Sequence, residues 1–508
     1  MKKLFPERLL LMPLCLAYCA CCLGQQLTDS VVLDRVRQRS LLSESALQLV
    51  WQNPVVAQWQ RNYSISDVAI GYQWRHESQA VVVQLGNHDA QGTFDAETHI
   101  KHRTRTLWGR AHYDKGSTRG IAWNETSDIH MVYPYLMADS AVLAPMRHER
   151  YGFGGGYADH RGRWQWGGEV DYRAGHYYRN VDPRPRNITA CLTVKGGVGW
   201  SLSSRYVAAA ALAYQRYKQT NDVVFYSELG KEKLFHLTGL ANDYGRFAGA
   251  GDESFYRAHQ WQVMVGVHPF ANQGLSVAAR ASRMSLDKVL TSLNKLPLAH
   301  IAQWAVDGEM AWLEHSWNTR MRVEASRRVG RENIFGDPAA SVYPMIGSLD
   351  MYHENRFAAC LDGVWQHRWR NVDLGVKPAV DYAHVNTIYA DPAGRQCINS
   401  LTPALALRGG YRTPSTYSTL HVQFAWTHPV EQELMLSGVK AELTGLQQVL
   451  ESDHRYASHN RTALNAALAV HVALSNRYAL QAAVDWCFTR YTAGAVAHRL
   501  KSSVAIIF

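Results

Sequence analysis

The sequence has 508 residues, of which 47% are hydrophobic, 11% aromatic and only 19% charged, and its formal net charge is +10. The positive charge does not indicate nucleic-acid binding, because no basic run with interleaved aromatic residues occurs; basic side chains can instead face anionic lipid or line a membrane lumen. Beyond the N-terminal stretch, no apolar run is long enough for a spanning helix, so the mature chain is either a soluble protein or a membrane barrel.

The N-terminus has the layout of a secretory signal. Lys2, Lys3 and Arg8 precede an apolar stretch over residues 9–23, and a polar stretch follows. We therefore predict a cleavable signal peptide over residues 1–24 and export of the protein. A membrane anchor is the weaker interpretation, because the apolar stretch is shorter than the roughly 20 residues that span a bilayer.

The cysteines fall into two groups. Cys19 is the best candidate for a lipoprotein attachment site, but the bulky Tyr18 stands where a small residue is expected, which disfavours lipidation. The four cysteines of the mature chain are far apart in sequence. They form neither a disulfide framework nor a CxxC metal pair.

The segment after the signal peptide has helical character. Residues 31–52 read VVLDRVRQRSLLSESALQLVWQ, and their apolar spacing is compatible with a helix that ends near Asn53-Pro54. We predict that residues 25–60 form a helical plug or periplasmic lead; an ordered leader explains the pattern equally well. Residues 67–86 are either one more strand hairpin or part of such a plug.

Residues 163–174, RWQWGGEVDYRA, alternate with a period of two. Trp164, Trp166, Val170 and Tyr172 fall on one face, and charged or polar residues fall on the other, as expected of a half-buried strand. Residues 372–382, 420–427, 478–489 and 500–508 alternate in the same way. The polar faces give the predicted lumen-lining residues: Arg163, Gln165, Glu169, Asp171, Arg173, Asp373, Lys377, Asp381, Arg499 and Lys501.

The lengths of these strands distinguish a sandwich from a barrel. They are longer than the five or six residues of an ordinary strand, and their ends are aromatic. This pattern is typical of tilted strands in an outer-membrane barrel, with an apolar outside, a polar lumen and aromatic girdles. Phe508 ends the last alternating strand and is predicted to act as the insertion signal for the barrel-assembly machinery.

The connections alternate between short and long, as barrels of this class require. Short turns are predicted near 475–476, 413–415, 368–371, 316–317, 272–273, 203–204, 159–162 and 116–117, and longer stretches over 429–458, 387–400, 328–352, 286–301, 218–256, 177–186 and 126–148. The turn at Gly116-Ser117 makes residues 99–114 the sixteenth strand. We predict an all-β transmembrane antiparallel β-barrel of about 18 strands, within a range of 16 to 20, that occupies residues 61–508.

The long stretch 429–458 contains an apolar repeat. Leu436, Val439, Leu443, Leu446 and Leu450 recur at steps of three and four, which predicts a short helix. The helix packs either on the barrel mouth, which is the favoured interpretation, or on a partner.

The segments WNETSDIHMVYPYLMADS and ERYGFGGGYA, within residues 123–158, resemble the signature region of an uncharacterised family of outer-membrane β-barrel proteins in Bacteroidota. The resemblance runs from about Val68 to Phe508 and implies location and fold but no substrate. Its motif-loop residues are Trp123, Asn124, Glu125, Asp128, Tyr133, Pro134, Tyr135, Asp139, Glu149 and Tyr151.

Known catalytic patterns are missing from the sequence. Gly154 to Gly156 lack the Lys and Ser or Thr of a phosphate loop, and the 23 histidines include no HxxxH metal pair beside a carboxylate. Asp128, His130, Asp139, His148 and Glu149 gather around one predicted loop, where they hold the loop in shape or, as the weaker interpretation, catalyse a reaction. We expect no enzyme activity, no cofactor and no bound metal.

Two functions remain. The first is a channel or transporter for an unidentified solute in the outer membrane of a Gram-negative bacterium. The second is a structural barrel whose loops bind a lipoprotein, a TonB-dependent receptor or a secretion component. A barrel of about 18 strands is wide enough for water unless something fills it, which favours transport.

Overall fold

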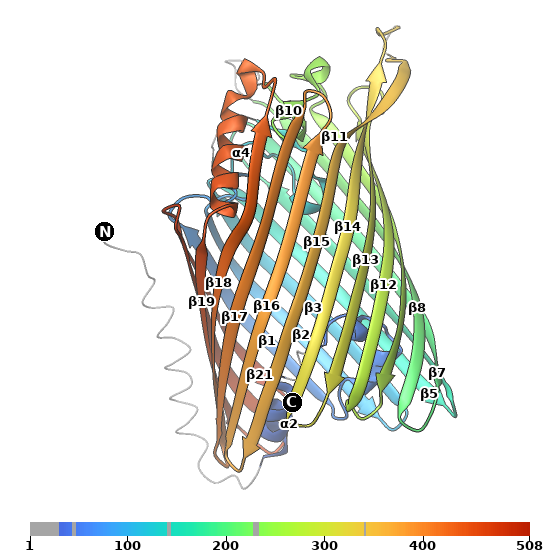
Figure 1. Cartoon of the computed structure of the whole chain (residues 1–508), viewed down its shortest axis with the longest axis vertical. Helices are drawn as coiled ribbons and strands as arrows, with labels where there is room; N and C mark the ends of the chain where they lie inside the picture. Colours follow the sequence, from blue (N-terminus) through green and yellow to red (C-terminus); the bar gives the residue numbers. More distant parts are fainter. Residues whose placement is uncertain (1–29, 43–46, 140–143, 227–232, 340–341) are drawn as a thin grey trace.

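The computed structural model describes residues 30–42, 47–139, 144–226, 233–339 and 342–508. Within these residues the chain forms a closed antiparallel barrel of 18 strands, a few short helices and a small three-stranded sheet (Figure 1). The last strand, β21 (Val496–Ile507), pairs with the first, β1 (Ile65–Glu77), and this pairing closes the ring. The prediction of an all-β barrel of about 18 strands is confirmed. The predicted signal peptide lies outside the described residues.

The other barrel strands follow around the ring in chain order, each antiparallel to the one before. They are β2 (His88–His102), β3 (Arg105–Arg119), β5 (Met146–Arg161), β6 (Trp164–Tyr178), β7 (Arg184–Ser201), β8 (Tyr206–Val224), β11 (Glu253–Pro269), β12 (Gly274–Leu290), β13 (Leu296–Leu313), β14 (Trp317–Phe335), β15 (Met345–Trp369), β16 (Val372–Tyr389), β17 (Gly394–Arg412), β18 (Thr416–Leu436), β19 (Arg461–Ala473) and β20 (Ala479–Tyr491). The small sheet contains β4 (Met137–Ala138), β9 (Phe235–Gly239) and β10 (Asn242–Asp243).

The helices are short. They are α2 (Val31–Arg39), α3 (Ile129–Val132) and α4 (Thr444–Ala457), with 3-10 turns η2 (Val50–Gln52), η3 (Val56–Trp59), η4 (Val83–Leu85), η5 (Gly245–Phe247) and η6 (Ala441–Leu443). In the described part of the chain, none of the helices has the length and apolar character needed to cross a membrane.

Alternation along the strands gives the barrel an apolar outside and a polar inside. On β6, the side chains of Trp164, Trp166 and Tyr172 are exposed on the outer face, whereas Gln165 between the two tryptophans is 2% exposed and points into the barrel. Charged residues on the inner faces pair across neighbouring strands, as Arg280 does with Asp307 at 2.8 Å. The period of two in the sequence therefore predicts which face each residue occupies.

The two rims differ. At the lower rim in Figure 1, where the chain ends, the strands are joined by short turns; α4 and the small sheet lie at the upper rim. The predicted short turns from residue 159 onward all fall in these lower connections. Three of the predicted long stretches are wrong, because residues 286–301, 328–352 and 387–400 are mostly strand that continues above the apolar band, and half of residues 177–186 is also strand.

The predicted turn at Gly116-Ser117 is wrong. Both residues lie within β3, and β2 and β3 are joined instead at residues 103–104, so residues 99–114 span a hairpin rather than one strand. A Cβ atom at Gly116 would lie 2.4 Å from the carbonyl oxygen of Ala90, so the glycine serves a close approach between strands. Residues 67–86 contain β1 and η4 rather than a hairpin.

The two predicted helices are both partly correct. Among the described residues of the 31–52 stretch, only Val31–Arg39 is α-helical, and the 3-10 turn η2 follows it. In the 429–458 stretch the helix is Thr444–Ala457, and its buried Leu446 packs inside the barrel's own mouth, as the favoured interpretation predicted. Leu436 belongs to β18 instead.

Candidate functional site

The N-terminal segment, whose described residues are 30–42 and 47–64, runs along the inner wall of the lower lumen. Val32, Leu33 and Val36 of α2 pack against Tyr417 and Ile507 of the wall. Arg37 donates two hydrogen bonds of 2.8 Å to the carboxylate of Asp373 on β16, and both side chains are buried. This bidentate pair is a strong polar anchor between the segment and the wall.

A second anchor holds the backbone at the start of η2. The Glu309 carboxylate on β13 accepts hydrogen bonds from the backbone N–H groups of Gln48, Leu49 and Val50, at 3.0, 3.1 and 3.2 Å. Glu309 is 3% exposed. A buried carboxylate thus satisfies three backbone donors of a segment that belongs to no sheet.

The third contact is on the far side of the ring. A Cβ atom at Gly167 would lie 2.7 Å from the Pro54 carbonyl oxygen, and one at Gly199 would lie 2.8 Å from Val55. These glycines on β6 and β7 therefore make room for the segment to lie against the wall. Because β6 and β7 are opposite β16 to β18 in the ring, the segment contacts both sides of the lower lumen.

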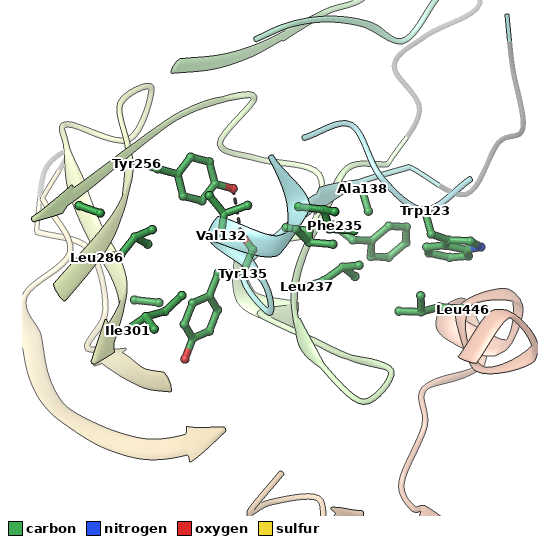
Figure 2. Close-up of a cluster of buried hydrophobic side chains, with 14 of the residues drawn as sticks. Trp123, Val132, Tyr135, Ala138, Phe235, Leu237, Tyr256, Leu286, Ile301 and Leu446 are labelled. Atoms are coloured by element: carbon green, nitrogen blue, oxygen red, sulfur yellow. Dashed lines mark hydrogen bonds between the residues drawn. The ribbon is translucent and has the colours of Figure 1, made fainter. Parts of the chain in front are cut away.

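The upper mouth is filled by a cap, which we define as residues 120–139, 233–252 and 441–457. Its core joins loop residues to inward-facing strand residues, as Figure 2 shows. The core residues include Trp123, Val132, Tyr135, Ala138, Phe235, Leu237 and Leu446 from the loops, and Tyr256, Leu286 and Ile301 from the strands. The cap is thus held mainly by burial of apolar surface.

The first motif residues build the inner part of this cap. The Asn124 side chain donates to the Gln84 carbonyl oxygen at 3.0 Å and accepts from the Thr126 N–H at 2.9 Å. Glu125 forms a buried ion pair with Arg179. Breaking such a pair leaves an uncompensated charge, so these residues fix the fold of the cap.

The wall also supplies donors for the cap's backbone. Arg328 donates to the carbonyl oxygens of Tyr133 at 2.9 Å and His130 at 3.2 Å. Lys288, which is fully buried, donates to the Leu136 carbonyl oxygen at 3.0 Å. The Arg328 contacts satisfy two carbonyl groups at and just after α3, and the Leu136 carbonyl accepts from the Leu237 N–H of β9 at 2.9 Å as well as from Lys288.

Burial shifts the pKa of Asp453 and of His236 in the cap. The carboxylate of Asp453 on α4 accepts a hydrogen bond of 3.1 Å from the Val83 N–H, and burial raises its pKa to about 7. Burial lowers the pKa of His236 on β9 to about 3, and the neutral ring donates to the Ala250 carbonyl oxygen at 2.9 Å. Asp453 therefore titrates near neutral pH at the contact between α4 and η4.

Between the N-terminal segment and the cap lie two adjoining cavities of about 800 and 910 Å³ that share Gln262 and Arg280. Gln52 of the N-terminal segment lines the first cavity, and His130 and Tyr133 of the cap line the second. We call this space the central chamber. Its walls are rich in charged and amide side chains, so it is a hydrophilic space inside the barrel.

Most charges around the chamber are paired. Arg110 donates to Asp171 at 2.9 Å, Lys195 to Glu169 at 2.9 Å and Arg320 to Asp362 at 2.8 Å. The His112 ring lies between two carboxylates, with Nδ1 2.6 Å from Asp95 and Nε2 2.8 Å from Asp114. Charges of both signs are interleaved, so the chamber carries no extended region of one sign.

The structure places the predicted lumen residues as follows. Glu169, Asp171 and Arg173 face the chamber region, and Lys501 pairs in register with Gln73, which lines the chamber. Gln165 and Asp373 face inward but are covered by the N-terminal segment. Lys377 lies 3.7 Å from Asp362 on the inner face, and Asp381 and Arg499 share the inward alternation of their strands. Arg163 differs: it lies in the turn between β5 and β6 at the lower rim.

The predicted motif loop separates into two groups. Trp123, Asn124, Glu125, Tyr133, Pro134, Tyr135 and Asp139 belong to the cap, and Asp128 points from the cap to the chamber. Glu149 and Tyr151 lie outside the loop, on β5, where Glu149 pairs with Lys115 at 2.7 Å and Tyr151 is exposed. Both side chains face outward because they occupy odd-numbered positions of β5, which alternate with the inward-facing ones.

The five polar residues of the predicted loop cluster do not form one site. His148 faces inward and contacts Gln91 at 3.0 Å, whereas Glu149 faces outward on the next position of the same strand. Among the described residues, no group of three or more His, Cys, Asp or Glu side chains is arranged to hold a metal ion. The absence of enzyme activity stays a prediction.

Phe508 exchanges backbone hydrogen bonds with Ser66, and its role in insertion also stays a prediction.

Sequence reasoning missed several chamber and anchor residues, which lie on β12 to β15. Arg280, Asp307, Glu309, Arg320 and Asp362 all occupy inward positions of these strands. The same period of two, applied to residues 274–369, would have identified them. The partner of each residue across the strands could not be found in this way.

Comparison with known proteins gives one family and several solved structures. A family model matches residues 54–508, and it describes a family of unknown function (DUF6850). This agrees with the predicted resemblance to a family without an assigned function; the bacterial group named with that resemblance stays a prediction. None of the curated proteins matches the sequence.

Solved structures with a similar path of the chain include two receptors and one transporter. The ferric preacinetobactin receptor BauA from Acinetobacter baumannii is 9% identical, with a TM-score of 0.40 over 88% of this chain and 80% of that one. The copper transporter OprC is 8% identical, with a TM-score of 0.40 over 88% and 81%. A variant of the ferric enterobactin receptor PfeA from Pseudomonas aeruginosa is 9% identical, with a TM-score of 0.36 over 88% and 80%. At these low identities and TM-scores, the solved structures do not indicate which ligand this chain binds.

Proposed function

This chain belongs to the DUF6850 family, a family of unknown function, so we propose its activity from the geometry of the lumen rather than from membership. The protein is an outer-membrane transport barrel that carries a polar solute through the central chamber. Segments of its own chain open and close the path.

The outer face supports the membrane location. On β13 the outward side chains run from Trp304 through Val306 and Met310 to Trp312, and each of these four is more than 40% exposed. Residues 304–312 match the roughly 9–11 residues with which a tilted strand crosses a bilayer. Tryptophan at both ends of an apolar run is the arrangement of an aromatic girdle.

The observation that carries the proposal is the central chamber. Two adjoining cavities of about 800 and 910 Å³ lie within the barrel, lined by charged and amide side chains. A barrel that serves only as a scaffold gains nothing from keeping a polar space of this size, because filling it with packed side chains would stabilise the fold. A chamber between two occupied ends suits a solute that is held during passage.

The lining of the chamber limits the class of solute. Positive groups such as Arg280 and Arg356 each lie beside a negative group, Asp307 and Glu354 respectively. Paired charges cancel at a distance and offer hydrogen bonds close by, so they do not select an ion of one sign. A neutral or zwitterionic solute rich in hydrogen-bonding groups, such as a small oligosaccharide or peptide, fits this lining.

The N-terminal segment is the favoured moving part. It joins the barrel covalently at β1. It is held to the wall by polar anchors at Asp373 and Glu309 and by two apolar clusters. Polar anchors can be replaced by water when the segment leaves, and each of its apolar clusters contains fewer buried residues than the core of the cap, so moving the cap would expose more apolar surface. Withdrawal of the segment toward the lower rim would open the chamber on that side.

The structural barrel remains the second candidate. The paired inner charges and the closed cap favour it, since a sealed barrel needs neither selectivity nor a gate. In that case the upper loops would bind the lipoprotein, TonB-dependent receptor or secretion component that the sequence suggested. The conductance of the lumen distinguishes the two functions.

The test is single-channel conductance in planar bilayers for the refolded protein and for a variant lacking residues 27–60. Transport predicts small or intermittent conductance in the full chain and steady, larger conductance in the variant. Circular dichroism and heat-modifiable gel mobility establish that both barrels are folded. Silence in two correctly folded proteins would overturn the transport proposal and favour the structural barrel.

A further inference from the structure

A basic groove lies on the outer face of the barrel, above the apolar band of β12 to β15. It has a volume of about 540 Å³ and is lined by Arg283, His300, Trp304, Arg327 and Arg331, among others. These strands rise to the upper rim in Figure 1. The groove is therefore on the outside of the wall and belongs neither to the central chamber nor to the cap.

The strand register centres the groove on one tryptophan. Trp304 on β13 pairs in register with Arg283 on β12 and with Arg327 on β14. The Arg283 guanidinium lies 5.7 Å from the centre of the Trp304 ring. Trp304 also marks the upper end of the outward apolar run on β13, so the two arginines flank a girdle residue at the edge of the apolar band.

The acidic residues nearby are already paired with other groups. Asp287 accepts from Arg257 at 3.1 Å and from His300 at 2.8 Å, and Asp350 accepts from Arg331 at 2.7 Å. Within the described part of the chain, neither Arg283 nor Arg327 has an ion-pair partner. Both side chains are exposed. The groove thus presents two available guanidinium groups at the level where a lipid headgroup would lie.

This arrangement has the chemistry of a phosphate site in a membrane interface. Guanidinium groups bind phosphate oxygens with two parallel hydrogen bonds, and they are less strongly hydrated than ammonium groups. Strands β12 and β14 are separated by two strand spacings, roughly 10 Å. Two arginine side chains can span this distance and contact the same headgroup. Val306 and Met310 continue below as apolar surface for acyl chains.

The geometry points to a binding site for a phosphorylated lipid of the leaflet at the upper rim, with Arg283 and Arg327 on its phosphate groups and Trp304 between them. This lipid site rests on the membrane location in the proposed function and adds a specific lipid contact to it. It does not depend on transport, because no residue of the groove faces the lumen.

The experiment uses the full-length protein in detergent and native mass spectrometry of bound lipid. The probes are diphosphorylated lipid A, the same lipid without phosphates, phosphatidylglycerol and inorganic phosphate. The variants are Arg283→Gln with Arg327→Gln, the double Lys variant at the same positions, and Arg147→Gln, a control for an exposed arginine on β5 outside the groove.

We expect the unsubstituted protein and the Arg147 control to retain one diphosphorylated lipid, and the double Gln variant to bind it at least tenfold more weakly. The double Lys variant should be intermediate, since it keeps the charge without the paired hydrogen bonds. Equal binding of the lipid without phosphates, unchanged binding by the double Gln variant, or full competition by millimolar inorganic phosphate would each overturn the assignment.

Flotation with lipid vesicles separates this test from that of membrane location. A protein that inserts into vesicles but fails the phosphate tests refutes only the lipid site. A protein that folds in detergent but does not float with vesicles refutes the membrane location, and the lipid site with it.

Discussion

Replacing Glu309 should release the N-terminal segment from the lower lumen. Its carboxylate accepts three backbone hydrogen bonds from residues 48–50. Hydrogen bonds to a charged group contribute about 1.5 kcal/mol each at the low end of their range, so Glu309→Ala should destabilise the bound segment by about 4.5 kcal/mol. At about 1.4 kcal/mol per tenfold change, the released population rises roughly 10³-fold. Arg320 would lose its contact of 3.7 Å with Glu309 but would keep its hydrogen-bonded ion pair with Asp362.

Glu309→Gln should have a smaller effect. The Oε1 atom accepts from Leu49 and Val50, and the amide oxygen of Gln can retain these two bonds. The amide nitrogen would replace Oε2 and face the Gln48 N–H, so one hydrogen bond and the charge are lost. We expect a loss of about 2 kcal/mol, or roughly a 30-fold increase in release.

The assay is amide hydrogen exchange by mass spectrometry on peptides that cover residues 47–52. Glu354→Gln is the matched control, since Glu354 is also inward-facing and buried but contacts Tyr352 and Arg356 of the wall. Protection should fall in the order unsubstituted protein, Gln variant, Ala variant. Unchanged protection in Glu309→Ala would refute the anchor argument. Lost protection without any gain in conductance would keep the anchor but refute the gate.

Three further outcomes follow from other contacts. Arg37→Glu should release α2 and raise the frequency of channel opening, and adding Asp373→Arg should restore the closed state if this pair is the anchor; failure of the rescue would assign the effect to other contacts. Gly199→Val should displace residues 54–55, because even a Cβ atom would lie 2.8 Å from Val55, whereas Gly196→Val, where a Cβ meets nothing within 4 Å, should leave their exchange protection unchanged. Raising the pH from 5 to 8 should weaken the contact of α4 with η4: burial raises the pKa of Asp453 to about 7 from an ordinary 3.8, so the packed helix holds a proton that the detached helix has lost, and stability falls as pH rises until about 7. Asp453→Asn should remove this pH dependence of exchange in residues 446–456, and an equal dependence in the variant would contradict the assignment.

The sequence determined the barrel because a strand with an apolar outer face and a polar inner face must alternate. Each outward position of residues 163–174 meets apolar surroundings and each inward position meets polar ones, so the period of two records both the strand and its orientation. The same rule fails above the apolar band. Residues 286–301 and 387–400 were expected to be loops, yet most of them continue as strand above the apolar band, because hydrogen bonds to neighbouring strands stabilise them there.

Local turn chemistry was also an incomplete guide. Gly116-Ser117 has the composition of a turn, but Gly116 serves a close approach to β2, and the true turn at Arg103-Thr104 contains neither glycine nor proline. Arg103 adopts a positive φ of 45° there. The strand pairing on either side enforces that turn, and pairing is a property of the whole sheet.

The candidate site was decided by the tertiary structure. Alternation placed Asp373, Glu169 and Asp171 on the inner face, but it could not show that Asp373 binds Arg37, which is 336 positions away in the chain. Nor could it show that Glu309 captures the backbone of residues 48–50. Periodicity reports the environment of each residue separately, whereas a chamber, an anchor or a groove exists only where closure of the ring brings distant strands together.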